Sequence, residues 1–148
     1  MCGFAGVFGQ LNSYSLAPVV EAMARSLAHR GPDDDGVWVD DEAGIAFGHR
    51  RLAVLDLSQE GHQPMLSKGG RYAIAFNGEV YNYQILRKEL ESEESINWRG
   101  HSDTEVILEA MSRWGIEHAL AKFVGMFAIA LFDRRERRLH LIRDRMGE

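Results

Sequence analysis

The stretch Tyr72-Ala-Ile-Ala-Phe-Asn-Gly78 decides the fold class. Large apolar side chains at Tyr72, Ile74 and Phe76 alternate with alanines, which is the period-two pattern of a β-strand without a polar face. A strand that is apolar on both sides has to be covered on both sides. We therefore expect this strand to lie inside a layered structure and to end at Asn77-Gly78.

Working outward from this strand, the chain shows strands and helices in alternating groups. Apolar runs predict further strands near 4–8, 36–39, 45–55, 126–132 and 139–142. Helical spacing predicts helices over 16–28, after Gly78, over 103–114 and briefly up to Lys122. Ser102-Asp-Thr-Glu105 has the spacing of a capping box, and Gly115 is placed to end the helix. This order predicts the α+β class, as a sandwich of antiparallel sheets whose outer faces are covered by helices.

Composition narrows the class of protein. The chain has 148 residues, which predicts one domain over 1–148. Its net charge of −5 argues against nucleic-acid binding, and the only basic run, Arg134–Arg138, is expected to be a solvated turn. No apolar stretch has membrane-spanning length, so no membrane association is expected. A single cysteine excludes an internal disulfide and predicts a cytoplasmic location, and no metal-ligand spacing occurs.

Cys2 is the strongest candidate for a nucleophile. Removal of Met1 would leave it with both a thiol and a free α-amine. An α-amine with an unperturbed pKa of about 7.7–8.0 can act as a general base near neutral pH, and the thiolate is the attacking form of cysteine. One residue would then supply nucleophile and base, with a bridging water as our hypothesis for the proton path. The alternative is a buried cysteine without a chemical role.

Asn77 and Gly78 are candidate donors for the same chemistry. Thiolate attack on a carboxamide forms an oxyanion, which a side-chain amide and a glycine N–H can stabilise. A plain Asn-Gly turn is the alternative.

Charged residues elsewhere are candidates for substrate binding. Arg50 and Arg51 lie at a predicted strand end, where a guanidinium can hold an α-carboxylate, although both can equally be surface residues. Asp103 can bind a ligand ammonium or simply favour the helix dipole.

Several short segments occur in a recognisable order. They are Met1-Cys-Gly-Phe-Ala-Gly-Val-Phe8, His29-Arg-Gly-Pro-Asp33, His49-Arg-Arg-Leu52, Gly61-His-Gln-Pro64, Asn77-Gly-Glu-Val-Tyr-Asn82, Ser102-Asp-Thr-Glu105, Phe123-Val-Gly-Met-Phe-Ala128 and Arg143-Asp-Arg-Met-Gly147. Together they resemble the class II glutamine amidotransferases of the N-terminal-nucleophile hydrolase superfamily. Within that class the chain looks like the glutaminase domain of glutamine-hydrolysing asparagine synthetase. The resemblance covers essentially the whole chain.

The resemblance implies a four-layer αββα sandwich and a role for each matching residue. Cys2 would be the nucleophile, with Asn77 and Gly78 as the oxyanion hole. The family pattern His-x-Arg-Leu selects Arg51 to hold the glutamine α-carboxylate. Glu79 would border the pocket, Asp103 would bind the α-amine, and main chain would line the pocket at Leu52, Ala53, Val54 and Leu55. No metal or cofactor is expected in this domain.

The resemblance also sets expectations for a longer protein. Such relatives continue past Gly147 with another strand and then a synthetase domain that uses ATP and Mg²⁺, so we expect the chain to stop before its last strand. The expected partners are L-glutamine and that C-terminal synthetase domain, and a homodimer stays open. The alternatives are a glutaminase domain that serves another carboxylate acceptor and a non-catalytic binding module.

Overall fold

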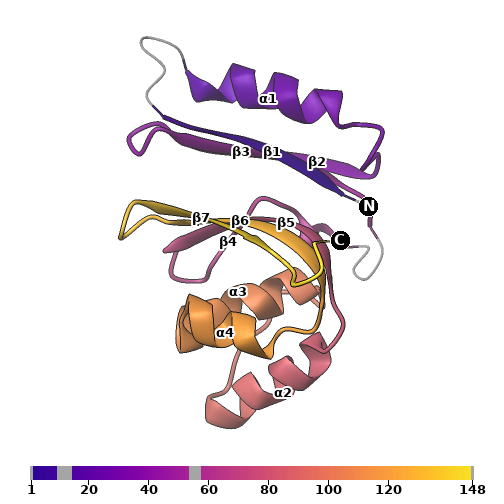
Figure 1. The fold of residues 1–148 in the computed structure, drawn as a ribbon, viewed down its shortest axis with the longest axis vertical. Helices are drawn as coiled ribbons and strands as arrows, with labels where there is room; N and C mark the ends of the chain where they lie inside the picture. Colours follow the sequence, from indigo (N-terminus) through magenta and orange to yellow (C-terminus); the bar gives the residue numbers. More distant parts are fainter. Residues whose placement is uncertain (1, 10–14, 54–57, 148) are drawn as a thin grey trace.

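Two antiparallel sheets face each other in the computed structural model, which describes residues 2–9, 15–53 and 58–147 (Figure 1). The smaller sheet has the order β1-β3-β2, built from β1 (Gly3–Phe8), β2 (Asp34–Asp40) and β3 (Ile45–Arg51). The larger sheet has the order β4-β5-β6-β7, built from β4 (Met65–Leu66), β5 (Tyr72–Val80), β6 (Gly125–Asp133) and β7 (Arg138–Arg143).

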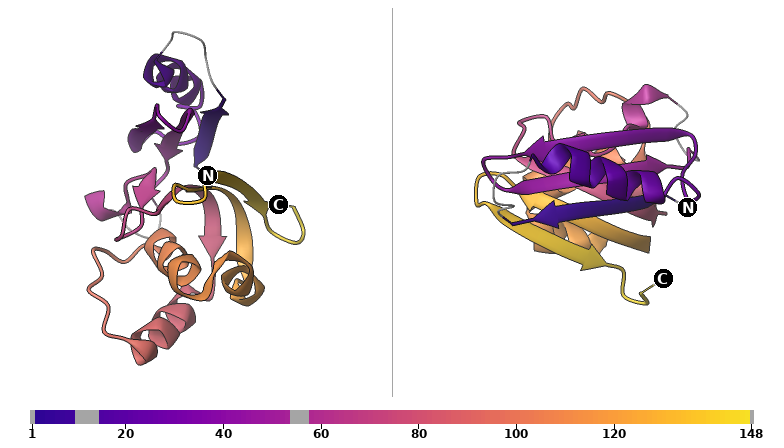
Figure 2. Two further views of the ribbon diagram at one scale, coloured as in Figure 1. Left: turned by 90° about the vertical axis from the view of Figure 1, so that its left-hand side faces the viewer. Right: turned by 90° about the horizontal axis from the view of Figure 1, so that it is seen from above.

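Helices cover the outer face of each sheet. Helix α1 (Leu16–Ser26) lies across the smaller sheet, as Figure 2 shows in the view from above. The larger sheet is covered by α2 (Tyr83–Glu93), α3 (Asp103–Trp114) and α4 (Ile116–Lys122) (Figure 1). The layers therefore follow the order αββα, and the predicted α+β sandwich is confirmed. Within the described ranges, no helix has the length and apolar character needed to cross a membrane.

Strand β5 is covered on both faces, as its sequence predicts. Its large side chains, including Ile74 and Phe76, belong to the core cluster shared with α2 and α3. Ala73 and Ala75 point the other way and pack in a second cluster with Phe47 of β3. The small alanine side chains let the two sheets approach closely, while the large ones fill the wider space under the helices.

The predicted end of this strand at Asn77-Gly78 is wrong. Strand β5 continues to Val80 and pairs with β6 in an unbroken register that places Gly78 opposite Phe127. Gly78 has a φ of 149°, and an added Cβ would lie 2.1 Å from the main-chain oxygen of Met126. Only glycine fits here without a clash. The Asn-Gly pair is therefore part of a strand, and the alternative of a plain turn is excluded.

The predicted capping box of α3 forms in one direction only. Ser102 Oγ accepts the N–H of Glu105 at 3.3 Å, as expected for an N-cap. The Glu105 carboxylate, however, accepts the N–H groups of Arg99 and Gly100 at 2.9 and 3.0 Å. It therefore fixes the loop that leads into α3. At the other end Gly115, with a φ of 82°, ends the helix as predicted.

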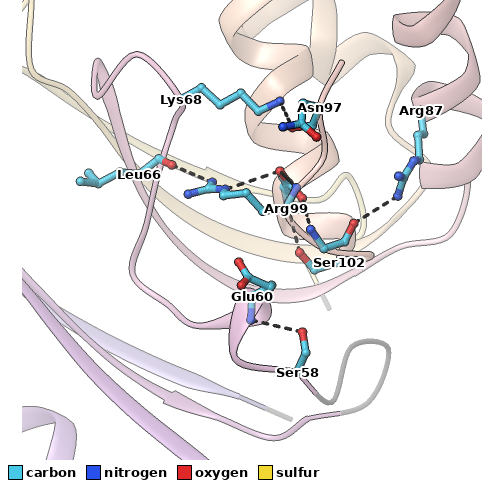
Figure 3. Close-up of polar contacts among 10 residues, drawn as sticks. Ser58, Glu60, Leu66, Lys68, Arg87, Asn97, Arg99 and Ser102 are labelled. Carbon is cyan, nitrogen blue, oxygen red and sulfur yellow. Dashed lines mark hydrogen bonds and ion pairs between the residues drawn. The ribbon is translucent and has the colours of Figure 1, made fainter. Parts of the chain in front are cut away.

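The loop before α3 is also tied to the hairpin between β4 and β5, as Figure 3 shows. Arg99 donates to the main-chain oxygen of Leu66 at 3.0 Å, and Lys68 donates to that of Asn97 at 2.5 Å. These contacts fix the start of α3 against the larger sheet. The position of Asp103, the first residue of α3, follows from them.

The remaining boundaries differ in detail. Strand β3 ends at Arg51, earlier than the predicted 45–55, and α1 ends at Ser26. The basic run forms an exposed turn between β6 and β7, as predicted. Arg134 in this turn donates to Asp40 Oδ2 of β2 at 3.1 Å, and Arg137 donates to the main-chain oxygen of Glu42 at 2.8 Å. The turn therefore links the two sheets at one edge.

Replacing Glu105 by alanine should destabilise the fold. The substitution leaves the N–H groups of Arg99 and Gly100 without their charged acceptor, and we expect a loss of about 3 kcal/mol in the free energy of unfolding. Urea unfolding followed by circular dichroism measures this loss. Glu117→Ala, at an exposed acidic position in the first turn of α4, is the matched control and should cost less than about 1 kcal/mol. Equal losses in the two variants would contradict the assigned role of Glu105.

Candidate active site

A cavity of about 250 Å³ collects most of the predicted site residues. Its walls come from the residue before β1, the end of β3, the segment with Gly61 and Gln63, the second half of β5, the start of α3 and β6. The predicted residues that line it are Cys2, Arg51, Leu52, Asn77, Gly78, Glu79 and Asp103. Segments as far apart in the chain as Cys2 and Met126 thus contribute to one small cavity.

Cys2 is held at the edge of the smaller sheet. It directly precedes β1, which pairs with β3 so that Gly3 lies opposite Arg50. The N–H of Leu52 donates to Cys2 Sγ at 3.3 Å, and the Leu52 oxygen lies 3.7 Å from the same sulfur. A main-chain N–H directed at sulfur stabilises negative charge there. The thiol is half-buried, so the cavity and not bulk water surrounds it on one side.

The N–H groups along β5 alternate in direction, and this alternation gives the direction of the Gly78 N–H. Phe127, opposite Gly78, donates its N–H to Asp144 Oδ2 at 3.0 Å, and its main-chain oxygen accepts the N–H of Asp144 at 2.9 Å, both on the side away from β5. Gly78 therefore belongs to a pair that makes no ladder bonds, and its N–H points away from β6. Two residues along in each direction, the N–H groups of Phe76 and Val80 point the same way and donate to side chains.

The N–H of Gly78 consequently faces the cavity. It lies between two N–H groups that already have side-chain acceptors. Phe76 donates to Gln63 Oε1 at 2.7 Å, and Val80 donates to Asp103 Oδ2 at 3.0 Å. The side chain of Asn77 lines the same cavity. A carboxamide and a main-chain N–H directed into one cavity are the donor set that an oxyanion requires.

Asp103 is a buried carboxylate with an altered proton affinity. Asp103 is only 5% exposed. Burial raises the pKa of Asp103 to about 6, the hydrogen bond from Val80 opposes this shift, and the charge of nearby Glu79 adds to it. A buried carboxylate next to a second one is a favourable site for a ligand cation.

The structure separates the two neighbouring arginines. Arg51 is 8% exposed, lines the cavity and donates from Nη1 to the Ser58 oxygen at 2.9 Å. Arg50 points to the other side of β3, where it donates to the Gly31 oxygen at 3.1 Å and lies 3.3 Å from Asp35. Alternation along a strand puts only one of two adjacent side chains in the cavity, and that one is Arg51.

The other predicted lining residues are placed less directly. Glu79 is half-buried and lines the cavity. Ala53 is not among the lining residues, and its N–H donates to Asp33 Oδ2 at 2.9 Å. Val54 and Leu55 lie outside the described residues. The roles predicted for all of these positions stay predictions.

Three residues near the cavity were not singled out from the sequence. Arg30 donates from Nε to the main-chain oxygen of Cys2 at 3.0 Å and so fixes the backbone of the candidate nucleophile. Gly61 lies against the Arg51 guanidinium, and an added Cβ there would be 2.1 Å from Nη2. Gln63 binds β5 as described above. The motifs His29-Arg-Gly-Pro-Asp33 and Gly61-His-Gln-Pro64 contain all three, and that was the only signal available in the sequence.

His49 lies behind the cavity as a neutral side chain. It is fully buried, and its Nε2 donates to the Phe76 oxygen at 2.9 Å. Burial lowers the pKa of His49 to about 4. Among the described residues, only His49 Nδ1 and Asn77 Oδ1 are buried side-chain atoms without a hydrogen-bond partner. Such atoms are rare and tend to occur at functional sites. No group of three or more potential metal ligands occurs in the described ranges.

Comparison with known proteins identifies the family. The sequence matches the glutamine amidotransferase domain family over residues 1–148. The chain belongs to this family. The predicted resemblance and the predicted enzyme class are thereby confirmed.

Similar proteins agree with this assignment. Asparagine synthetase (glutamine-hydrolysing) 1 of Bacillus subtilis (strain 168) is 40% identical over 153 aligned positions, covering 99% of this chain and 23% of that protein. Amidase chry2 of Gibberella zeae is 36% identical over 132 positions, covering 87% of this chain and 19% of that protein. The chain thus spans about a quarter or less of the length of these relatives. The asparagine synthetases among the relatives favour the predicted glutaminase domain over its alternatives.

A solved structure supports the fold independently. Glutamine phosphoribosylpyrophosphate amidotransferase from Bacillus subtilis, complexed with ADP and GMP, superposes with a TM-score of 0.76 at 22% identity. The match covers 97% of this chain and 37% of that one. At this identity the likeness concerns the fold alone, and it confirms the αββα arrangement.

The two perturbed groups beside the cavity have opposite effects on acid stability. The pKa of His49 is lowered from 6.5 to about 4, so the unfolded chain binds this proton first and stability falls as the pH falls through that window. The pKa of Asp103 is raised from 3.8 to about 6, so the folded chain binds this proton first. Its contribution to stability therefore increases as the pH falls from about 6 toward 3.8.

Asp103→Asn should remove the contribution of Asp103 to the pH dependence of stability and leave that of His49. We expect the wild-type chain to gain stability relative to the variant as the pH falls from 6 to 4, by up to about 1.4 kcal/mol per pH unit. Urea unfolding of both proteins at several pH values measures the difference. A difference that stays constant across this range would contradict the raised pKa of Asp103.

Proposed function

We propose that this domain hydrolyses L-glutamine to glutamate and ammonia through a γ-glutamyl thioester on Cys2. The observation that carries the proposal is the shared cavity, in which a thiol faces an oxyanion donor set and two sites of opposite charge. The family assignment gives the reaction class. The geometry suggests which atom performs each step.

The charges of the cavity match a free amino acid. The guanidinium of Arg51 can hold the α-carboxylate in a bidentate manner. The charge of Glu79 raises the pKa of Asp103, so the two carboxylates lie close together, and together they suit an α-ammonium. Because these groups are fixed by β3, β5 and α3, they leave the side-chain amide of glutamine as the part that reaches the thiol.

The first half-reaction is the attack of the Cys2 thiolate on the amide carbon. The carbonyl oxygen becomes an oxyanion, to which the Asn77 amide and the Gly78 N–H donate. The carbon–nitrogen bond then breaks, and the nitrogen takes up a proton and departs as ammonia. The γ-glutamyl thioester remains on Cys2. The α-amine of Cys2, free once Met1 is removed, is the proposed base that first accepts the thiol proton and then delivers it.

The second half-reaction consumes one water. The same α-amine takes a proton from the water as it attacks the thioester carbon, and the oxyanion donors act a second time. The carbon–sulfur bond breaks, glutamate leaves, and the thiol is restored. The sum is one glutamine and one water converted to one glutamate and one ammonia.

In the longer protein we propose that the ammonia passes to a C-terminal synthetase domain. The relatives named asparagine synthetases suggest that this domain makes asparagine, with ATP and Mg²⁺ bound there and not in the glutaminase domain. A cytoplasmic location is part of this proposal because the single cysteine suits a reducing compartment. Association into a homodimer stays a prediction.

Processing of the N-terminus should switch the activity on. Protein without Met1 is expected to release ammonia from glutamine, whereas protein that keeps Met1 has an amide in place of the base and should be inert. Cys2→Ser in the processed chain should lower the rate by a factor on the order of 10³ or more. N-terminal mass analysis combined with an ammonia assay and with labelling by a glutamine-analogue electrophile tests this. Equal activity with and without Met1 would rule out the α-amine as the base.

The two arginines provide a matched pair of variants. Arg51→Lys replaces a bidentate guanidinium in the cavity by a single ammonium, so KM for glutamine should rise about tenfold or more. Arg50→Lys changes the neighbouring side chain, outside the cavity, and should leave KM within about twofold. Steady-state kinetics on both variants decide the assignment. If KM rises equally in both, Arg51 does not bind the carboxylate.

A further inference from the structure

Gln63 is a buried amide that contacts two walls of the cavity at once. It is 5% exposed and lies between η1 (Gln59–Gly61) and β4. Its Oε1 accepts the N–H of Phe76 at 2.7 Å, and its Nε2 donates to Thr104 Oγ1 at 3.4 Å. Phe76 immediately precedes Asn77, and Thr104 immediately follows Asp103. One side chain therefore joins the strand with the oxyanion donors to the helix with the ammonium site.

The main chain cannot make the contact that Gln63 makes. Strand β4 pairs with β5 only through Met65 and Leu66, opposite Ile74 and Ala73. Extending this register would place Gln63 opposite Phe76, but the main-chain oxygen of Gln63 lies against Gly36 of β2 instead. The Gln63 side chain takes over beyond that point. Without it, the buried N–H of Phe76 would lack an acceptor.

The backbone of Gln63 packs against the smaller sheet. Its main-chain oxygen lies so close to Gly36 of β2 that an added Cβ at Gly36 would be 2.2 Å away. Strand β2 pairs with β3, which carries Arg51 and leads to the residue that holds the Cys2 sulfur. Gln63 thus has a contact with the smaller sheet, with β5 and with α3.

We propose that Gln63 is a positioning residue for glutamine hydrolysis. It holds the oxyanion donors on β5 at a set distance from Asp103 on α3, so that capture of the α-ammonium places the side-chain amide at those donors. An amide suits this task because it offers one acceptor and one donor to two different partners. The inference rests on the proposed glutaminase function and adds a residue that does not touch the reacting atoms.

Two substitutions separate the contacts of Gln63. Gln63→Met keeps the length of the side chain but removes both hydrogen bonds, so kcat should fall and KM should rise, for a combined loss of about tenfold or more in kcat/KM. Thr104→Val removes only the contact with α3, so it should raise KM with a smaller effect on kcat. The double variant should be no worse than Gln63→Met, because both changes break one linkage.

The controls use the processed chain or the longer protein that contains it. Gln84→Met makes the same exchange at an exposed position on α2 and should leave kcat and KM unchanged. Alkylation of Cys2 by iodoacetamide, with and without glutamine, reports binding separately from turnover. In the single variants the alkylation rate without glutamine should match wild type, while protection by glutamine should need a higher concentration.

The outcomes distinguish this inference from the function on which it rests. If the processed wild-type chain releases no ammonia from glutamine, the glutaminase proposal itself is wrong. An active wild type with kcat/KM of Gln63→Met within twofold would overturn the positioning role, as would additive losses in the double variant. If Gln63→Met does not fold, Thr104→Val alone decides, and an unchanged KM overturns the inference.

Discussion

The N–H groups along one edge of β5 impose the constraint on which the cavity depends. A buried main-chain donor needs an acceptor, and β4 supplies acceptors only at the beginning of this edge. Beyond it, two side chains take over: Gln63 binds the N–H of Phe76, and Asp103 binds that of Val80. The N–H of Gly78, between these two, points away from β6 and toward the cavity. A strand edge left incomplete by a short neighbour thus leaves an N–H that can donate to an anionic oxygen.

The two sheets contribute different parts of the chemistry. The smaller sheet carries Cys2 next to its first strand and Arg51 at the end of its central one, and the two meet because β1 and β3 are paired. The larger sheet and α3 carry the candidate oxyanion donors, Asn77 and Gly78, and Asp103. The substrate site is therefore assembled only when the sheets are packed, and the alanines of β5 allow that close packing.

The titratable groups beside the cavity make the stability of the fold depend on pH. Burial raises the pKa of the Asp103 carboxyl and so disfavours its charged form. His49 is kept neutral by burial and donates a hydrogen bond to the main-chain oxygen of Phe76 in β5. Both groups give the fold a dependence on pH, with opposite sign, which an apolar wall would not have.

Several features could be read correctly from the sequence because they depend on neighbours in the chain. The alternation of large residues and alanines in β5, the N-cap at Ser102 and the helix end at Gly115 are local patterns with local physical causes. The ordered motifs likewise identified the family and named Cys2, Arg51, Asn77, Gly78 and Asp103, all of which line one cavity. The family motif was required for Arg51, because the residues alone left Arg50 as an equal candidate.

Other features were decided by partners that are distant in the chain. The Asn77-Gly78 pair looks like a turn locally, but pairing with β6 keeps it in a strand, since that register places Asn77 opposite Ala128 and Gly78 opposite Phe127. Glu105 has the spacing of a reciprocal cap, yet the loop before α3 brings Arg99 and Gly100 to its carboxylate instead. The sequence by itself determined the layers and named the candidate reactive groups. Only the tertiary structure decided which N–H groups stay unpaired and which buried side chains fix them, because these depend on how two sheets and a helix meet.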